Sequence, residues 1–362
     1  MKVLIDGHML GTGEGGNERY IENLSLALLK DKTQTLKTQI IVPQEYYRKL
    51  GKTLKKDFIG QDFPSNIIRI FCTLPKVAKD LEADIIHATY VGPFFSRFKL
   101  VLMVHDLAFK RFPEFFTFRE KIIFDYFLPV SMAKAAAIVV PSEFTKKELI
   151  SFYPRHAKKV FVTHEASSPQ FKVINKDKAR NQIEKKYKIR SPFLLAFNGK
   201  HDKRNINRVI EAFEQIKYDF PNLQLVILGG KYHIKKKIDS KRIKILKNIS
   251  DKDLAVLYNA TEVVIYFSLY EGFGLPVLEA FSCKTPVIAS DIPAIREVAG
   301  NAALYANPQS ANDLAKTISR LIESKELQKK MSVKGFNKAS KYSWEKTAKE
   351  TIKIYKFALK KQ

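Results

Sequence analysis

The sequence predicts an α/β protein of two Rossmann-like domains, each a doubly wound parallel sheet. Short apolar runs alternate with longer amphipathic segments along most of the chain, which is the pattern of β-α-β units. The polar segment 167–190, poor in strand-forming residues, interrupts this alternation, and 362 residues suffice for two cores. We therefore expect one domain at 1–167, a second at 168–342, and a ligand cleft between their strand ends.

Apolar, β-branched runs indicate the strands of the first domain, because strands of a parallel sheet are buried on both faces. The expected strands are Val3–Ile5, Gln39–Val42, Ile67–Phe71, Ile85–His87, Leu100–Val104 and Ile138–Val140. Helical periodicity predicts helices at Glu18–Leu29, Phe115–Ala136 and Thr145–Phe152.

The second domain repeats the alternation after a linker and a solvated helix within 167–190. Its expected strands are Phe193–Phe197, Gln224–Leu228, Ile243–Leu246, Val263–Phe267 and Val287–Ala289. Its expected helices are Asn205–Lys217, Asp251–Ala260, Pro276–Phe281 and Ala311–Glu323. The sole tryptophan, Trp344, stands at the start of a last helix within 343–362, which we expect to pack back on the first domain.

Composition favours a cytosolic protein with reduced thiols. Cys72 and Cys283 fit neither a metal site nor a redox motif. Met1-Lys2 leads directly into the first strand, so we expect no signal peptide, and no run of 18 apolar residues predicts a membrane span.

The net charge of +26 is either compositional or the mark of an anionic partner. Basic residues cluster within 46–56 and again within 231–247. Such clusters suit an anionic membrane surface or nucleic acid, and no nucleic-acid-binding motif accompanies them. We therefore expect no nucleic-acid partner, and a cytoplasmic protein that is peripheral on the inner face of the membrane.

The strongest motif is Tyr270–Ala280, which follows the expected strand Val263–Phe267. Gly272 and Gly274 permit a tight turn and a close approach of backbone N–H groups to a ligand. Pro276 suits the first turn of a helix, whose N-terminus attracts anions. Glu271 and Glu279 flank this turn, one on the loop and one on the helix; helix capping alone is the simpler interpretation.

A cationic loop follows the first strand of the second domain. Gly199-Lys200-His201-Asp202-Lys203-Arg204-Asn205 places three cations at the start of a helix, where they oppose the helix dipole. This placement favours binding of a diphosphate over a solvated run of charge.

In the first domain a glycine loop and a histidine are the candidate ligand contacts. Gly11–Gly16 contains a G-x-G-x-x-G pattern, but its first glycine comes too late after the strand for a dinucleotide site, so Gly15 and Gly16 are expected to face a phosphate or a sugar. His105 lies just past the carboxyl end of a strand, where ligand contacts occur in such sheets. A histidine satisfied by local hydrogen bonds is the alternative.

Other features are interpreted structurally. His8 and His87 lack supporting residues, Asp251 and Asp253 are expected to cap a helix, and no histidine pair has metal spacing. The aromatic stretch 109–127 is partly core, with an interfacial or acyl-chain-contacting surface as the alternative.

Together these motifs resemble the retaining glycosyltransferases of family 4, which have the two-domain GT-B fold. The resemblance covers nearly the whole chain. Its most specific part is the family's E-x7-E signature. The matching segments are Glu271–Ala280, Thr285–Ser290, Ile292–Glu297, Gly15-Gly16, Val104–Leu107 and Pro141–Thr145.

The resemblance implies roles by position. Glu279 would bind the nucleotide ribose, Glu271 would act at the sugar end, and His105 would contact the transferred sugar. Lys203 and Arg204, beside Gly199, would neutralise the departing diphosphate. The N–H groups around Gly272, Phe273, Gly274 and Leu275 would contact donor oxygens. No metal or cofactor is implied, since the nucleotide sugar is a substrate. The chain departs from the family pattern in one loop, where Arg204-Asn205 replaces the usual Lys-Asn and the loop looks one residue short. The resemblance therefore leaves open whether Lys203 or Arg204 is the main phosphate contact.

The predicted activity is metal-independent transfer of a hexose from a nucleotide-diphosphate sugar to a glycan or lipid-linked acceptor. The segment His105–Phe109, followed by Phe112-Pro113, resembles enzymes of bacterial surface polysaccharide or lipopolysaccharide synthesis, which are often mannosyltransferases. This resemblance makes GDP-mannose the first expectation for the donor and a UDP-sugar the second. A sugar-nucleotide epimerase and a basic nucleic-acid-binding protein are the alternatives, but neither explains the paired glutamates.

Overall fold

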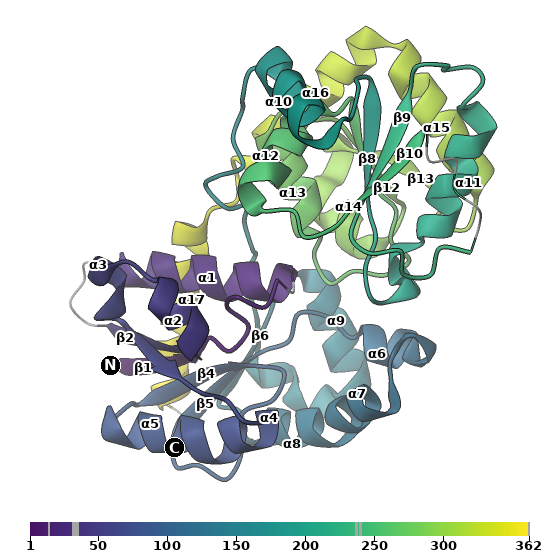
Figure 1. Ribbon diagram of the computed structural model, residues 1–362. Coiled ribbons are helices and arrows are strands. Elements are labelled where there is room, and N and C mark those ends of the chain that lie inside the picture. The colour runs from purple at the N-terminus through teal and green to yellow at the C-terminus, as the bar shows by residue number, and fades with distance from the viewer. Residues whose placement is uncertain (14, 31–35, 236–237, 239–240, 361–362) are drawn as a thin grey trace. The chain divides into compact units, whose positions relative to one another are not determined.

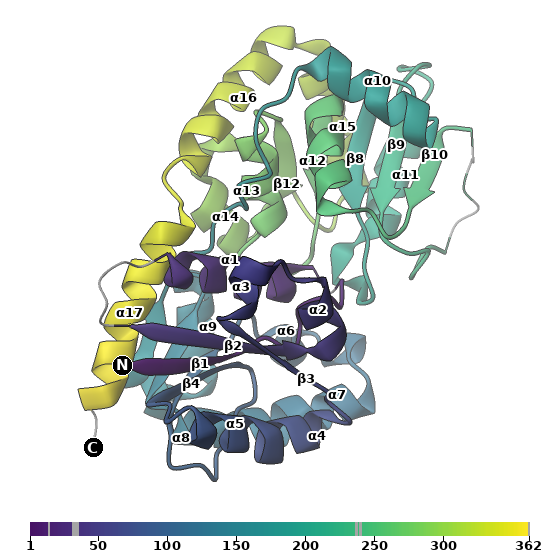
Figure 2. The same cartoon turned by 60° about the vertical axis from the view of Figure 1, so that its left-hand side comes forward.

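The computed structural model describes residues 1–13, 15–30, 36–235, 238 and 241–360. The chain divides into two compact units (Figures 1 and 2). Unit 1 comprises Met1–Glu165 and Ser343–Gln362, and unit 2 comprises Ala166–Tyr342.

Unit 1 is built on a seven-stranded parallel sheet with the order β3-β2-β1-β4-β5-β6-β7. Its strands are β1 (Lys2–Asp6), β2 (Lys37–Pro43), β3 (Phe58–Gln61), β4 (Ile85–Thr89), β5 (Lys99–Met103), β6 (Ala137–Val140) and β7 (Val160–Val162). Its helical segments are α1 (Gly16–Leu29), α2 (Gln44–Lys49), α3 (Lys52–Lys55), α4 (Asn66–Ile68), η1 (Arg69–Thr73), α5 (Leu74–Asp80), α6 (Ala108–Arg111), η2 (Pro113–Phe115), α7 (Phe118–Ile122), η3 (Ile123–Phe127), α8 (Leu128–Lys134), α9 (Glu143–Phe152), η4 (Pro154–Lys159) and α17 (Trp344–Lys360).

Both faces of this sheet are covered. Helices α5, α8 and α9 supply Leu74, Leu128 and Leu149 to the core on one face. On the other, α17 contacts α1, β5 and β6, and its first residue Trp344 is buried (Figure 2). The C-terminal helix is therefore part of unit 1.

The expected strand Ile67–Phe71 is wrong, because this segment is helical across α4 and η1. Ser65 caps it by accepting a hydrogen bond from the N–H of Ile68 at 3.2 Å. Buried side chains recur at helical spacing, at Ile70, Leu74, Val77 and Ala78, while Ile67 and Ile68 are exposed. The apolar run was therefore one turn of a helix.

The expected helix Phe115–Ala136 is present in altered form, as a capped helix with a wide turn in its middle. Thr117 and Glu120 form a capping box at the start of α7. The π-helical turns η1 and η3 each end just before a Leu-Pro pair, at Pro75 and Pro129. Proline has no N–H and its ring crowds the carbonyl four residues back, which a wider turn relieves.

Unit 2 has a six-stranded parallel sheet with the order β10-β9-β8-β11-β12-β13. Its strands are β8 (Phe193–Phe197), β9 (Gln224–Leu228), β10 (Ile243–Leu246), β11 (Val263–Tyr266), β12 (Val287–Ser290) and β13 (Leu304–Ala306). Its helical segments are α10 (Lys176–Tyr187), η5 (Asp202–Arg204), α11 (Ile206–Ile216), α12 (Asp251–Ala260), α13 (Leu275–Ser282), α14 (Pro293–Ala299), η6 (Gly300–Ala302), α15 (Ala311–Glu323) and α16 (Lys325–Ala339).

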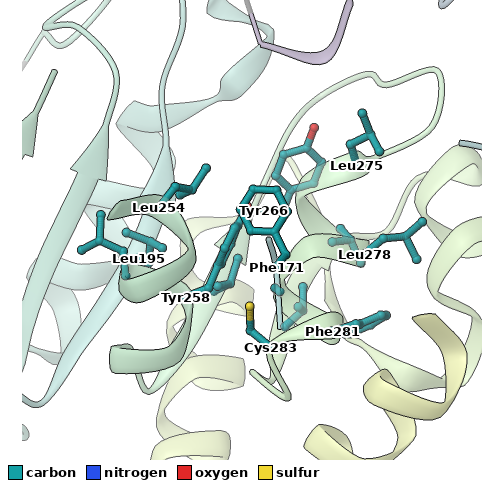
Figure 3. Packing of buried hydrophobic residues seen from close by; sticks show 14 of the residues in the cluster. Phe171, Leu195, Leu254, Tyr258, Tyr266, Leu275, Leu278, Phe281 and Cys283 are labelled. Carbon is teal, nitrogen blue, oxygen red and sulfur yellow. The ribbon is translucent and has the colours of Figure 1, made fainter. Parts of the chain in front are cut away.

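Strand residues of unit 2 alternate between two cores. Leu195 and Tyr266 pack with α12 and α13 (Figure 3). Leu194 and Ile265 pack with α11 and α15 on the opposite face. This period of two, with both faces apolar, is what a doubly wound parallel sheet requires.

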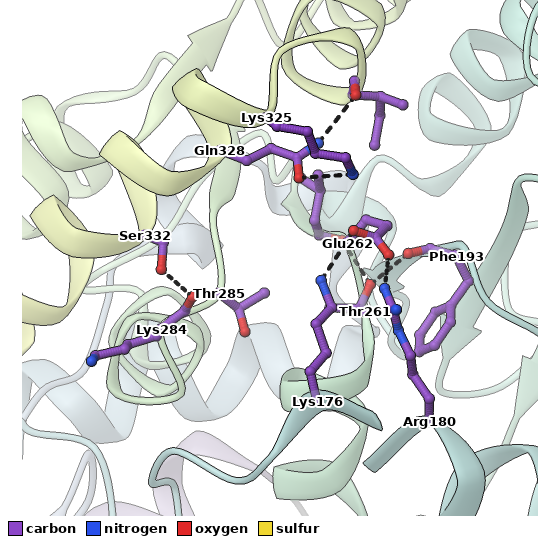
Figure 4. A network of polar contacts seen from close by, with 12 residues as sticks. Lys176, Arg180, Phe193, Thr261, Glu262, Lys284, Thr285, Lys325, Gln328 and Ser332 are labelled. Atoms are coloured by element: carbon purple, nitrogen blue, oxygen red, sulfur yellow. Dashed lines mark hydrogen bonds and ion pairs between the residues drawn. The ribbon is translucent and has the colours of Figure 1, made fainter. Parts of the chain in front are cut away.

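Helix α10 is not merely solvated, as the sequence suggested, because it packs on α12 and buries Ala179 and Ile183. Lys176 and Arg180 both pair with the buried carboxylate of Glu262 (Figure 4). The polar segment before β8 thus contributes to the core of unit 2.

Candidate functional site

The strand order of unit 2 places one switch point at its centre. From β8 the chain proceeds to β9 and β10 on one side, and β11 then starts again on the other side of β8. Val263 and Ile265 are in register with Leu194 and Ala196. Ligands of open α/β sheets bind outside the carboxyl ends of strands at such a point. The two loops there are 198–205 and 267–274.

The loop after β11 is buried and ends in a glycine-capped helix. Glu271 is 7% exposed and Phe273 4%. Gly274 has φ +113°, and a Cβ there would lie 2.5 Å from Cδ1 of Ile295. Helix α13 begins at Leu275 with Pro276 in its first turn and no side-chain cap. The expected strand, glycine turn and helix N-terminus are confirmed.

Arg204 links this loop to the loop after β8. Its guanidinium donates to Glu271 and to the hydroxyls of Tyr266 and, at 3.3 Å, Ser268. It also lies 5.2 Å from the centre of the Tyr266 ring, a cation–π contact. The carbonyl of Lys203 accepts a hydrogen bond of 2.8 Å from the N–H of Leu269. Two loops predicted to bind one ligand are thus joined.

Burial raises the pKa of Tyr266 well above its ordinary value, Glu271 adds to the rise, and Arg204 opposes it. The phenol therefore stays protonated. Its contacts with both Arg204 and Glu271 complete a cation, hydroxyl and carboxylate cluster.

The backbone fixes the position of Arg204. Asn205 adopts the left-handed conformation at φ 56° and donates a 2.7 Å hydrogen bond to the carbonyl of Pro308. Gly199 lies close by, since a Cβ there would be 3.5 Å from Cγ of Arg204, an ordinary contact. Gly199 is therefore near the cluster but is not sterically required.

Glu279 occupies a different environment from Glu271. It is fully buried in the second turn of α13 and accepts a 2.8 Å hydrogen bond from the hydroxyl of Tyr258. Burial, aided by Glu279, raises the pKa of the nearby Cys283 thiol to about 12. The two glutamates of the signature thus lie in different surroundings: Glu271 contacts Arg204 and Tyr266, and Glu279 accepts from Tyr258.

In unit 1 the corresponding switch point lies between β1 and β4. Gly15 caps α1 with φ 65°, and Gly16 is the first helical residue. The carboxylate of Glu18 accepts hydrogen bonds from the N–H groups of Gly11 at 2.6 Å and Gly13 at 2.8 Å. The glycine loop is thus tied to its own helix, with residue 14 outside the described residues.

His105 lies two residues past the end of β5 and is 9% exposed. Its Nδ1 lies 3.0 Å from Oε1 of Glu165. Its Nε2 has no hydrogen-bond partner among the described residues. The rings of Tyr20 and Tyr90 lie 4.9 and 6.0 Å away between centres. The alternative of a fully satisfied histidine therefore does not fit His105.

His87, by contrast, has partners on both nitrogens, Tyr355 at 2.6 Å and Tyr20 at 3.3 Å. Burial, and then the charge of His105, lower its pKa to about 3, so it stays neutral. His8 contacts the buried carboxylate of Asp6. Both histidines have the structural roles that their sequence context indicates.

Sequence reasoning missed several residues of these clusters. In unit 1, Arg69 forms a buried ion pair with Asp6. Burial alone would raise the pKa of that carboxyl, but Arg69 and His8 hold it well below its usual range. Glu165, Tyr258 and Tyr266 were also missed. The one available signal was that a buried tyrosine needs a partner for its hydroxyl.

No group of side chains that could hold a metal ion occurs in the described part of the chain. Ser250 caps α12 by accepting from the N–H of Asp253, whose carboxylate pairs with Lys186. The Asp-x-Asp segment is thus part of a helix start, with Ser250 supplying the cap itself.

Two family models match the chain. Residues 14–166 match the model described as Glycosyltransferase Family 4, and residues 177–338 match Glycosyl transferases group 1.

Related proteins are similar over much of the chain. The O-antigen chain mannosyltransferase B of Escherichia coli is 26% identical over 74% of this chain and 74% of its own length. The O-antigen chain mannosyltransferase RfbU of Salmonella typhimurium is 29% identical over 57% of this chain, and the match spans 56% of that protein. Anabaena Alr3699/HepE, solved in complex with UDP-glucose, superposes with a TM-score of 0.73 at 16% identity, covering 98% of each chain.

Proposed function

The chain belongs to the glycosyltransferases of family 4, and from that premise we propose that it transfers mannose from a nucleotide-diphosphate sugar, with retention of anomeric configuration. The acceptor is a glycan or lipid-linked glycan of bacterial surface polysaccharide. Similarity to two O-antigen mannosyltransferases supports the choice of sugar.

The cluster of Arg204, Tyr266 and Glu271 carries this proposal. It lies at the switch point between β8 and β11, beside the N-terminus of α13. A diphosphate bound there meets a cation and a helix N-terminus, both of which favour negative charge. The carboxylate of Glu271 is left to accept hydrogen bonds from sugar hydroxyls, because a carboxylate is an acceptor only.

The chemistry needs stabilisation of the leaving group. The bond between the sugar C1 and the phosphate oxygen breaks with both electrons on the oxygen, while the acceptor hydroxyl oxygen bonds to C1 on the same face. The acceptor proton passes to the departing phosphate. Cations aimed at the growing charge are then the main requirement, and removing one such donor typically costs about 3 kcal/mol.

The remaining roles follow the family resemblance. Glu279 binds the ribose, His105 contacts the transferred sugar, and Gly15, Gly16 and Gly199 leave room for phosphate or sugar. The N–H groups of Gly272, Phe273, Gly274 and Leu275 bind donor oxygens. Lys203 assists Arg204, which is the principal phosphate contact because three acceptors already orient it.

Thermal unfolding with a panel of GDP-, UDP- and ADP-sugars tests donor binding. A ligand at 100 times its Kd stabilises the folded state by about 2.7 kcal/mol. GDP-mannose is expected to raise Tm most, followed by UDP-sugars. Stabilisation by oligonucleotides alone would support the nucleic-acid alternative, and interconversion of free sugar nucleotide without acceptor would support an epimerase.

We also propose that unit 1 contacts an anionic membrane surface from the cytoplasmic side. None of the helices in the described part of the chain is both long and apolar enough to span a bilayer. Ring contacts of Phe71 with Phe94, Phe95 and Phe127 bring η1, the loop after β4 and η3 together. Exposed apolar side chains occur in η3, in the helices α4 and α7 that directly precede η1 and η3, and in the loop after β4. These are Ile67, Ile68, Phe95, Ile122, Ile123 and Tyr126.

Not every basic side chain of the two clusters, 46–56 and 231–247, is available to bind an anionic membrane surface. Arg242 is occupied with the carbonyls of Lys217, Phe220 and Leu223, and Lys49 pairs with Glu45. Within the second cluster, Lys236, Lys237 and Asp239 lie outside the described residues. The overall charge of +26 is therefore the stronger argument for an anionic surface.

Co-sedimentation with vesicles checks this part of the proposal. Binding is expected to vesicles rich in anionic lipid, to weaken with salt, and to fall in a Phe95→Ser/Tyr126→Ser variant. A Tyr218→Ser variant, at an exposed tyrosine of unit 2, is the matched control. Equal binding to neutral vesicles, or none to anionic ones, would contradict it.

A further inference from the structure

We propose that Glu165 is a positioning residue for His105. Glu165 holds the imidazole ring so that Nδ1 carries the proton and Nε2 is reserved for the substrate. The proposal rests on the proposed function, in which His105 contacts the transferred sugar. Glu165 follows β7 and is 4% exposed, and its Oε1 lies 3.0 Å from Nδ1 of His105.

The chemistry of the pair determines the tautomer. An ionised carboxylate can only accept hydrogen bonds, so the Nδ1 that faces it must donate. In the neutral ring Nε2 then has a lone pair that accepts from a sugar hydroxyl. A histidine that contacts a ligand is commonly oriented in this way by the partner of its other nitrogen.

The open nitrogen distinguishes this pair from an ordinary structural contact. Nε2 of His105 is shielded from solvent and has no hydrogen-bond partner among the described residues. Buried polar atoms in proteins rarely lack a hydrogen-bond partner unless a ligand or a water molecule supplies one. His87, one strand away, has both nitrogens occupied by tyrosine hydroxyls, and therefore serves as an internal comparison.

A second set of contacts limits rotation of the ring. Tyr20 meets His105 edge to face at 4.9 Å, and Tyr90 lies 6.0 Å away. The hydroxyl of Tyr20 is in turn 3.3 Å from His87, which contacts Tyr355 of α17. Glu165 therefore acts on a ring already confined by its neighbours, and its main effect is on the position of the proton.

Nitrogen NMR of the imidazole side chains tests the tautomer without requiring activity. The spectra are recorded over a series of alkaline pH values, and the tautomer is assigned where the side-chain nitrogen signals no longer change with pH. Wild-type His105, assigned by its disappearance in His105→Asn, is expected to show Nδ1–H. Glu165→Ala is expected to shift it towards Nε2–H while His87 is unchanged. An Nε2–H signal in the wild type would overturn the proposal.

Kinetics then test whether the position of the proton matters. Glu165→Gln removes the charge and lets the amide donate to Nδ1, so kcat is expected to fall about 10- to 100-fold, with donor KM changed less than threefold. When Glu165→Gln is combined with His105→Asn, kcat should fall no further than in His105→Asn alone. Additive losses in the double variant, or wild-type kcat in Glu165→Gln, would overturn the proposal.

The two arms separate the possible failures. If wild-type protein shows the Nδ1–H tautomer but transfers no sugar, the orientation by Glu165 stands and the proposed function fails. If it transfers mannose while Glu165→Ala leaves the tautomer unchanged, the function stands and the positioning role fails. Circular dichroism of each variant confirms that it is folded.

Discussion

Arg204 and Glu271, separated by 67 positions in the sequence, form a hydrogen-bonded ion pair across the carboxyl ends of two adjacent strands. Their side chains are 25% and 8% exposed. A partly buried cation held by a carboxylate and two hydroxyls is prepared to meet an anion without reorganisation. This pair makes the switch point of unit 2 the centre of the proposed reaction.

Replacing Arg204 tests its role as the phosphate contact. Arg204→Ala is expected to lower kcat about 100-fold, since a lost donor to the leaving group costs about 3 kcal/mol in the transition state. Arg204→Lys should recover part of the rate, because the charge remains but the planar fork is lost. Arg190→Ala, at an exposed arginine of the same unit, is the matched control. Wild-type kcat in Arg204→Ala would remove Arg204 from the mechanism.

Glu279 is expected to act on donor binding rather than on the chemical step. Glu279→Ala should raise donor KM strongly, by tenfold or more, because a charged hydrogen bond to the ribose is worth about 1.5–3 kcal/mol. Tyr258→Phe keeps the carboxylate of Glu279 and removes one of its hydrogen bonds. The donor KM of this variant should therefore lie between that of the wild type and that of Glu279→Ala. Steady-state kinetics over a range of donor concentrations measure both. An unchanged KM in Glu279→Ala would contradict the ribose contact.

Much of the fold was accessible from sequence because long apolar runs dominate it. The strands from Phe193 to Phe197 and from Gln224 to Leu228 have the predicted bounds. Short strands such as β3, β7 and β13 were missed, since three or four residues carry too little periodicity. Ile67–Phe71 failed for the related reason that a five-residue segment with four apolar residues fits a strand or a helical turn equally well.

For the candidate site, the sequence indicated two loops but not the contacts between them. The spacing of Glu271, Gly274 and Pro276 identified a loop and a helix N-terminus, and the cations of 200–204 identified a second loop. Their contact depends on β8 and β11 being neighbours, which strand order alone determines. The pairing of His105 with Glu165 joins positions 60 apart and has no local sequence signal.

Gly274 should be intolerant of any side chain. Its φ of +113° disfavours L-residues, and a Cβ would clash with Ile295 at 2.5 Å. Gly274→Ala is therefore expected to destabilise the protein by about 2 kcal/mol or more. Gly51→Ala, where the Cβ would meet no described atom within 4 Å, should be nearly neutral. Urea unfolding compares the stability of Gly274→Ala with that of Gly51→Ala. Equal urea midpoints for the two variants would contradict the claim that a side chain at position 274 is strained.

Stability should decline in mild acid partly because of His87. Its pKa is about 3 in the folded protein, against about 6.5 for an ordinary histidine. Between these values the unfolded chain binds a proton that the folded one does not. The stability from neutral His87 is thus fully present above about pH 6.5 and is lost as pH falls towards 3, by up to about 1.4 kcal/mol per pH unit.

Urea unfolding of wild type and His87→Gln at pH 7.5, 6.0 and 5.0 measures this loss. The wild type should lose more stability than the variant between pH 6.0 and 5.0. If the free energy of unfolding fell equally with pH in the wild type and in His87→Gln, His87 would not be the cause of the pH dependence.

The most direct test of the central claim is a transfer assay with GDP-mannose and a mannose-terminated lipid-linked glycan, comparing wild type with Arg204→Ala and Arg190→Ala. Wild type and Arg190→Ala are expected to release GDP and form an α-mannoside, as the anomeric proton and carbon signals of the product show, while Arg204→Ala is about 100-fold slower. Equal rates in all three proteins, or a product of inverted configuration, would contradict the account.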